Sequence, residues 1–125
     1  MTDQQRMLAL RILLILTAIP FIGLYGLVVA WPSGWAWGHG HSHHEVMIFG
    51  VYATLGVFLI RAARDPDAHR SLIWFTVWSS LVHGAIMAVQ ALGEPAEHGH
   101  LVGDVPALFI VAIALAALMR RREPA

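Results

Sequence analysis

The chain has 125 residues, enough for one compact domain. Apolar residues make up 58% of it and charged residues only 13%, whereas an ordinary soluble domain is about half apolar and about a quarter charged. A soluble chain of this size cannot bury so much apolar surface, so the composition predicts a membrane protein with the lipid bilayer as its partner. The zero net charge gives no reason to expect a nucleic-acid partner, and the absence of cysteine excludes disulfides and thiolate metal sites.

Four apolar segments predict four transmembrane helices, at about residues 7–31, 44–64, 71–92 and 105–119. A helix of roughly 20 residues crosses the hydrocarbon core, and none of the segments shows the period-two alternation of a strand. The first segment is too long for a cleaved signal peptide, so we expect a retained helix, with a kink at Pro20. The expected fold is all-α: an integral membrane four-helix bundle that forms a single domain over residues 1–125.

The positions of the arginines predict the topology. All eight basic residues are arginine, and they lie at the start of the first segment, around the turn between the second and third segments, and after the fourth. Four spans therefore place every arginine on one side of the membrane and none on the other. The positive-inside rule then predicts that both termini are cytoplasmic.

Two histidine-rich motifs fall on the opposite side, HGHSHHE at residues 39–45 and HGHLVGD at residues 98–104. Both read His-Gly-His, then three residues, then an acid. The second and fourth segments are short for a membrane, so we expect Glu45 and Asp104 at or just below the outer headgroups. A carboxylate at that depth is costly unless it is paired, protonated or turned inward.

Imidazole and carboxylate groups together suit a divalent metal such as zinc or copper. Histidine and acid are four residues apart in both motifs, so each pair shares a face if its helix extends back by one turn. The metal ligands predicted from the two motifs are His41, Glu45, His100 and Asp104, with His39, His43, His44 and His98 as secondary candidates. Two other interpretations stay open: a polar loop that keeps the helix ends in water, and a pH-responsive surface, because histidine titrates near neutrality.

The third segment carries a polar stripe. The stripe consists of Thr76, Ser80, His83, Met87 and Gln90. Their spacings of 4, 3, 4 and 3 residues place them on one face of a transmembrane helix. His83 lies inside the membrane, where an ionisable group is a functional candidate by default. It is either a deeper metal ligand or proton acceptor, or a neutral histidine bonded across helices to Ser79, Ser80, Tyr52 or a backbone carbonyl.

No catalytic constellation is evident. No oxyanion element or orienting acid accompanies Ser79 or Ser80, and the chain has no Gly-rich phosphate loop. We therefore expect a protein that is not an enzyme.

The run from Gly50 to Leu92, GVYATLGVFLIRAARDPDAHRSLIWFTVWSSLVHGAIMAVQAL, resembles a family of small bacterial membrane proteins known only as a domain of unknown function. WPSGWAW upstream and GHLVGDVPAL downstream resemble it too, so the resemblance covers about residues 11–118. In layout the chain is also similar, more distantly, to the DoxX-like four-helix membrane proteins. The resemblance implies a four-helix bundle in the bacterial inner membrane and carries over no catalytic residue. It favours a site built on Glu45, His83, His100 and Asp104 over a four-histidine site.

Three functional hypotheses follow. The first is a small non-enzymatic inner-membrane protein that binds a divalent metal at its outer face. The second is a structural or accessory membrane subunit without a ligand. The third is a redox accessory protein that associates with a quinone or a haem near His83. A homo-oligomer and a partner in a membrane complex are compatible with all three hypotheses.

Overall fold

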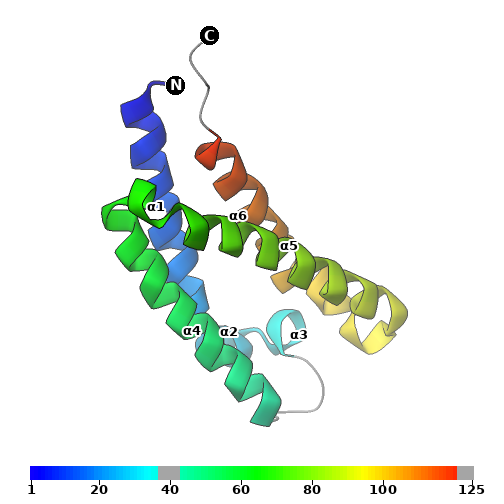
Figure 1. The fold of residues 1–125 in the computed structure, drawn as a ribbon. Helices are drawn as coiled ribbons and strands as arrows, with labels where there is room; N and C mark the ends of the chain where they lie inside the picture. The colour runs from blue at the N-terminus through cyan, green and yellow to red at the C-terminus, as the bar shows by residue number, and fades with distance from the viewer. Residues whose placement is uncertain (37–42, 121–125) are drawn as a thin grey trace.

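The computed structural model describes residues 1–36 and 43–120, and over these residues the regular elements are all helical (Figure 1). The predicted all-α fold class is therefore confirmed. In chain order the elements are α1 (Asp3–Ile22), α2 (Leu24–Ala30), α3 (Pro32–Trp35), α4 (His43–Arg64), the 3₁₀ helix η1 (Pro66–His69), α5 (Arg70–Gly93), the 3₁₀ helix η2 (Pro95–Val102) and α6 (Asp104–Met119).

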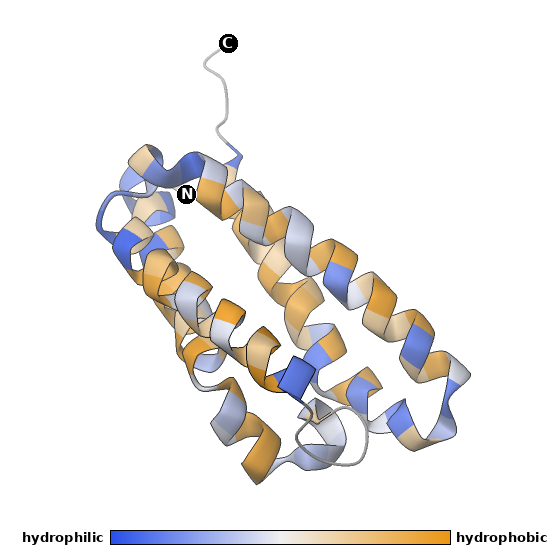
Figure 2. Cartoon of the chain, turned by 60° about the horizontal axis from the view of Figure 1, so that its bottom comes forward, coloured by the Kyte–Doolittle hydropathy of each residue, from blue (hydrophilic) through white to orange (hydrophobic). Residues whose placement is uncertain are grey.

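Four helical stretches are long and apolar enough to span a membrane: Asp3–Ile22, His43–Arg64, Pro66–Gly93 and Pro95–Met119. Their outward faces carry large apolar side chains; Val51, Phe75 and Val89 are 69%, 61% and 72% exposed. Exposing apolar surface to water costs about 25 cal/mol per Å², so these faces suit a lipid bilayer. Figure 2 shows the same division, with hydrophilic residues concentrated near the two ends of the bundle and apolar residues between them. The composition of the chain and its exposed apolar surface are those of a small multi-pass membrane protein.

The helices pair off as two hairpin-like units. α1 packs along α4, α5 packs along α6, and α1 also contacts α6, which joins the two pairs. Fully buried side chains from each of the four long helices form the shared core, among them Leu14, Leu59, Ile73 and Leu115. α4 and α5 diverge from the turn at η1, so the bundle widens toward its other end (Figure 1).

Close packing between α1 and α4 depends on one glycine. A Cβ atom added at Gly56 would lie 2.7 Å from Cγ1 of Ile22 and 3.0 Å from the carbonyl oxygen of Ala18. Small residues allow helix backbones to approach in lipid, where no hydrophobic force between helices drives association. Gly50, two turns earlier on α4, has open space at the same position.

The first predicted span is divided at Gly23, three residues after Pro20, and the kink predicted at Pro20 stays a prediction. α1 begins with a capping box at Thr2, passes through Pro20 and ends at Ile22. Gly23 separates it from α2, and the Gly23 amide donates to the carbonyl of Ile19 over 2.9 Å. Proline removes one helical hydrogen bond, whereas glycine is the residue that most readily leaves the helical conformation. The predicted second, third and fourth spans differ from α4, α5 and α6 by at most one residue at each end, whereas α1 begins at Asp3, four residues before the predicted start.

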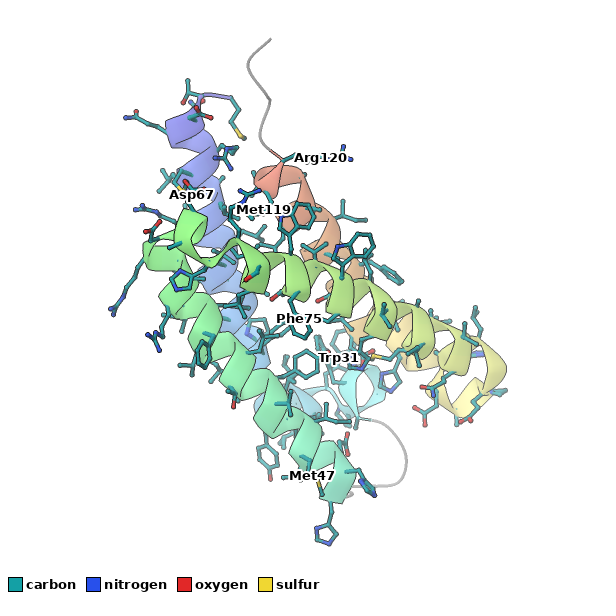
Figure 3. All side chains as sticks on the ribbon, in the orientation of Figure 1. Trp31, Met47, Asp67, Phe75, Met119 and Arg120 are labelled. Carbon is teal, nitrogen blue, oxygen red and sulfur yellow. The ribbon has the colours of Figure 1, made fainter. Side chains whose placement is uncertain are left out.

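All six arginines among the described residues lie at one end of the bundle, which we call the η1 end. There the Arg6 guanidinium donates to the carbonyl of Leu118 over 2.7 Å, which ties the start of α1 to the last turn of α6. Figure 3 shows Asp67 and Arg120 at this end and Met47 at the opposite one, the η2 end. The arrangement agrees with four spans, and the assignment of the η1 end to the cytoplasm stays a prediction.

The η2 end is closed by direct backbone packing. The fourth helix does not extend back by one turn as an α-helix, because η2 is a 3₁₀ helix and Gly103 separates it from α6. A Cβ atom at Gly103 would overlap the backbone of Gly34, and one at Gly99 would overlap the carbonyl of Ser33. The two glycines therefore let η2 and the start of α6 lie against α3.

Candidate functional site

His100 is the centre of a buried polar cluster at the η2 end. Its side chain is 0% exposed, and both ring nitrogens have partners. Nδ1 lies 2.8 Å from Oδ1 of Asp104, and Nε2 lies 2.8 Å from the carbonyl oxygen of Ala36 and 3.1 Å from Oε2 of Glu97. A carbonyl oxygen only accepts hydrogen bonds, so Nε2 carries a proton and donates it.

From the sequence, His100 and Asp104 share a helix face if the fourth helix extends back by one turn. The two side chains do meet, but they span the junction between η2 and α6 instead of lying on one continuous α-helix. Because both nitrogens are occupied, His100 offers no lone pair to a metal ion in this arrangement, as a ligand histidine must.

A cavity of about 310 Å³ lies beside this cluster, lined by residues from α1, α2, α3, α4, α5 and α6. Its apolar wall consists of Phe21, Leu24, Ile48, Phe49, Met87 and Leu108. Its polar wall consists of Trp35, His44, Glu45, Tyr52, His83, Gln90 and Asp104.

Three of the polar groups in the cavity interact across helices. The Tyr52 hydroxyl on α4 and Nδ1 of His83 on α5 form a hydrogen bond, and the Asp104 carboxylate interacts electrostatically with both side chains. His83 is therefore bonded across helices, one of the two interpretations open from the sequence. Tyr52 and His83 connect α4 with α5 where the two helices have already diverged.

Trp35 also lines the cavity, and its indole nitrogen is a hydrogen-bond donor. Nε1 is buried and has no hydrogen-bond partner among the described residues. Buried donors in proteins are almost always satisfied, by protein, by water or by a ligand. Trp35 therefore marks a place where a molecule in the cavity can offer an acceptor.

The predicted metal ligands are only partly brought together. Glu45, His83 and Asp104 line the same cavity, with the secondary candidate His44, whereas His43 and His98 are exposed and lie outside it. The candidates His39 and His41 lie outside the described residues. Within residues 1–36 and 43–120, no group of three or more histidine and acidic side chains could hold a metal ion.

Two residues of the site were missed from the sequence. Glu97 precedes His100 by three residues, so its spacing could have indicated the contact. Trp35 is separated in the sequence from the residues of the His100 cluster, and the residues around it do not indicate a cavity.

The charge of the cavity restricts its ligands. Among the described residues that line it, the ionisable groups are two acids, two histidines and one tyrosine, with no arginine or lysine. A phosphate or carboxylate end would meet like charge in a medium of low dielectric constant, which is unfavourable. The cavity therefore suits an uncharged or positively charged polar group attached to an apolar body.

The chain belongs to the family described as "Family of unknown function (DUF6632)", whose model matches residues 5–123. The resemblance to a domain of unknown function is thereby confirmed, while bacterial origin and similarity to DoxX-like proteins stay predictions. Comparison with curated proteins and with solved structures gave no match.

Proposed function

For this member of the family, we propose a non-enzymatic membrane protein that binds a lipid-soluble small molecule of the quinone class. The observation that carries the proposal is the cavity, whose lining combines apolar side chains with a set of polar ones. Small-molecule sites have this composition and volumes of roughly 300–1,000 Å³. A volume of about 310 Å³ is enough for one ring and the start of its apolar tail.

The polar groups favour an uncharged ring that carries oxygen atoms. The Asp104 carboxylate already contacts His100, so it does not depend on a cationic ligand for a partner. The Trp35 N–H group is buried without an acceptor among the described residues, and a quinone carbonyl can supply one. Phe21 and Tyr52, which meet edge to face with centroids 4.9 Å apart, add aromatic surface for ring packing.

Entry from the bilayer is consistent with the shape of the bundle. α4 and α5 diverge toward the η2 end, and Ile48 on α4 both lines the cavity and is 47% exposed. A ligand dissolved in the membrane can pass this side chain without crossing the apolar core at the η1 end.

Thermal unfolding of the purified protein with a decyl-substituted benzoquinone tests the proposal. Binding to the folded state stabilises it by about 2.7 kcal/mol when the ligand is at 100 times its Kd, so we expect a saturable rise in the unfolding midpoint. Ile48→Trp should fill the mouth of the cavity and abolish the rise. Val51→Trp, an equally bulky change at an exposed α4 position outside the cavity, should retain it.

Three outcomes would overturn the quinone assignment. One is no rise with the benzoquinone, and another is the same rise in both tryptophan variants. The third is stabilisation by the lipophilic cation tetraphenylphosphonium without any by the benzoquinone. A haem would instead be recognised by a Soret band after haem-replete expression.

The predicted zinc or copper site stays a separate hypothesis. It needs either His41, outside the described residues, or a rearrangement that frees a nitrogen of His100. Elemental analysis of the same preparation decides: stoichiometric metal that is lost in the Glu45→Ala, Asp104→Ala double variant would favour the metal over the quinone. A structural or accessory subunit would show neither metal nor ligand.

A further inference from the structure

We propose that His100 is a proton relay that joins the surface carboxylate of Glu97 to the cavity carboxylate of Asp104. The relay gives the cavity proton exchange with the water at the η2 end. It does not depend on which ligand the cavity binds, so it can be tested on the empty protein.

The three side chains form an unbroken chain of short contacts. Glu97 is 14% exposed and its Oε2 lies 3.1 Å from Nε2 of His100, which is fully buried. On the other side of the ring, Nδ1 lies 2.8 Å from Oδ1 of Asp104, which is 8% exposed and lines the cavity. Both distances are within the hydrogen-bond reach that proton transfer requires.

Imidazole can pass a proton because it binds hydrogen at either nitrogen. In the outward direction, protonated Asp104 gives its proton to Nδ1, which forms an imidazolium and a carboxylate. Nε2 then gives its proton to the Glu97 carboxylate, which releases it to water. One proton moves from Asp104 to Glu97, and the ring is neutral before and after, with its proton on the other nitrogen. The inward direction is the reverse.

Among the described residues, few other titratable groups surround the ring. α3 contributes only the Ala36 carbonyl next to its end, because α3 itself has no titratable side chain. On α5, which also packs on η2, the titratable groups are His83 in the cavity and Arg70 at the η1 end. α4 contributes His44, Glu45 and Tyr52 to the cavity wall, and because His44 is exposed it offers a second route between the cavity and water.

Toward the η1 end the described residues offer no comparable chain. The core there is apolar, with Leu10, Leu14, Leu59 and Ile73 at most 1% exposed. The hydroxyls of Thr17 and Thr76 donate to the carbonyls of Leu13 and Leu72 in their own helices. The relay therefore connects the cavity with one side of the membrane only.

Hydrogen–deuterium exchange of the histidine side chains tests the relay. The protein, labelled with ¹⁵N-histidine and held in lipid nanodiscs, is transferred into D₂O, and the ring N–H signals of His83 and His100 are followed. Glu97→Gln keeps the shape of the side chain but removes the proton acceptor, so it should slow both signals by about tenfold or more. His100→Gln should slow the His83 signal to a similar extent. Glu94→Gln, at an exposed acid just before η2, is the matched control and should exchange as wild type does.

The sign of the effect separates a relay from a purely structural role. If His100 and Glu97 only hold the η2 end closed, both variants open it and the His83 signal exchanges faster. Faster exchange, or exchange at the wild-type rate in Glu97→Gln and His100→Gln, would overturn the relay while leaving quinone binding to be judged from the thermal shift.

Discussion

His100 shows how one buried side chain can satisfy groups from three segments. Its ring bonds the Ala36 carbonyl after α3, contacts Glu97 in η2 and bonds Asp104 at the start of α6. A buried polar group is tolerated when its hydrogen bonds are complete, and an acid at membrane depth needs a partner. His100 meets both requirements, so we expect it to contribute to stability as well as to proton exchange.

Replacing His100 by alanine should lower the free energy of unfolding by about 3 kcal/mol, because it leaves the Asp104 carboxylate and the Ala36 carbonyl buried without their partner. Unfolding of the detergent-solubilised protein by heat or by a denaturing detergent measures the loss. His98→Ala, an exposed histidine of the same segment, should change stability by no more than about 0.5 kcal/mol. Equal losses in the two variants would contradict this role for the ring.

At the scale of helices, the contact between α1 and α4 depends on the size of a single residue. Gly56→Ala forces a methyl group against the Ala18 carbonyl and the Ile22 side chain, and overpacking of this kind costs about 1–3 kcal/mol. We therefore expect a lower unfolding midpoint for Gly56→Ala.

Gly50→Ala is the matched control on the same helix. Its added methyl group meets open space, and alanine favours a helix over glycine by up to about 1 kcal/mol. It should be neutral or stabilising in the same unfolding assay. If Gly50→Ala lost as much stability as Gly56→Ala, the loss in Gly56→Ala could not be attributed to the close approach of α1 and α4.

The junction next to α3 shows what helix periodicity alone does not reveal. Gly103 ends η2 and separates it from α6. At Gly103 the reason is tertiary, because the backbone of Gly34 comes too close for any Cβ atom. Such a requirement cannot be seen in the local sequence.

For the whole molecule, the arrangement of charge predicts its orientation in the membrane. The six described arginines are gathered at the η1 end, while η2 and its neighbouring residues carry acids and histidines. The positive-inside rule predicts that the η1 end faces the cytoplasm, and this orientation stays a prediction.

Labelling of single cysteines tests this orientation, since the chain has no cysteine of its own. Ala96→Cys at the η2 end should react with a membrane-impermeant maleimide on intact cells whose outer barrier has been removed. Ser71→Cys at the η1 end should react only after lysis; both positions are exposed in the fold. The reverse pattern would place the arginines outside, against the prediction.

The sequence alone determined the all-α class, the number of spans and the gathering of the arginines, because hydropathy and charge act on each segment separately. The spacing of four residues also predicted the pairing of His100 with Asp104, a local contact. Only the tertiary structure decided that Nε2 of His100 donates to the Ala36 carbonyl, and that Trp35, Tyr52 and Glu45 line one cavity. It also decided that Gly99 and Gly103 allow η2 to pack against α3. These contacts join segments far apart in the chain, and no periodicity records which helix faces will meet.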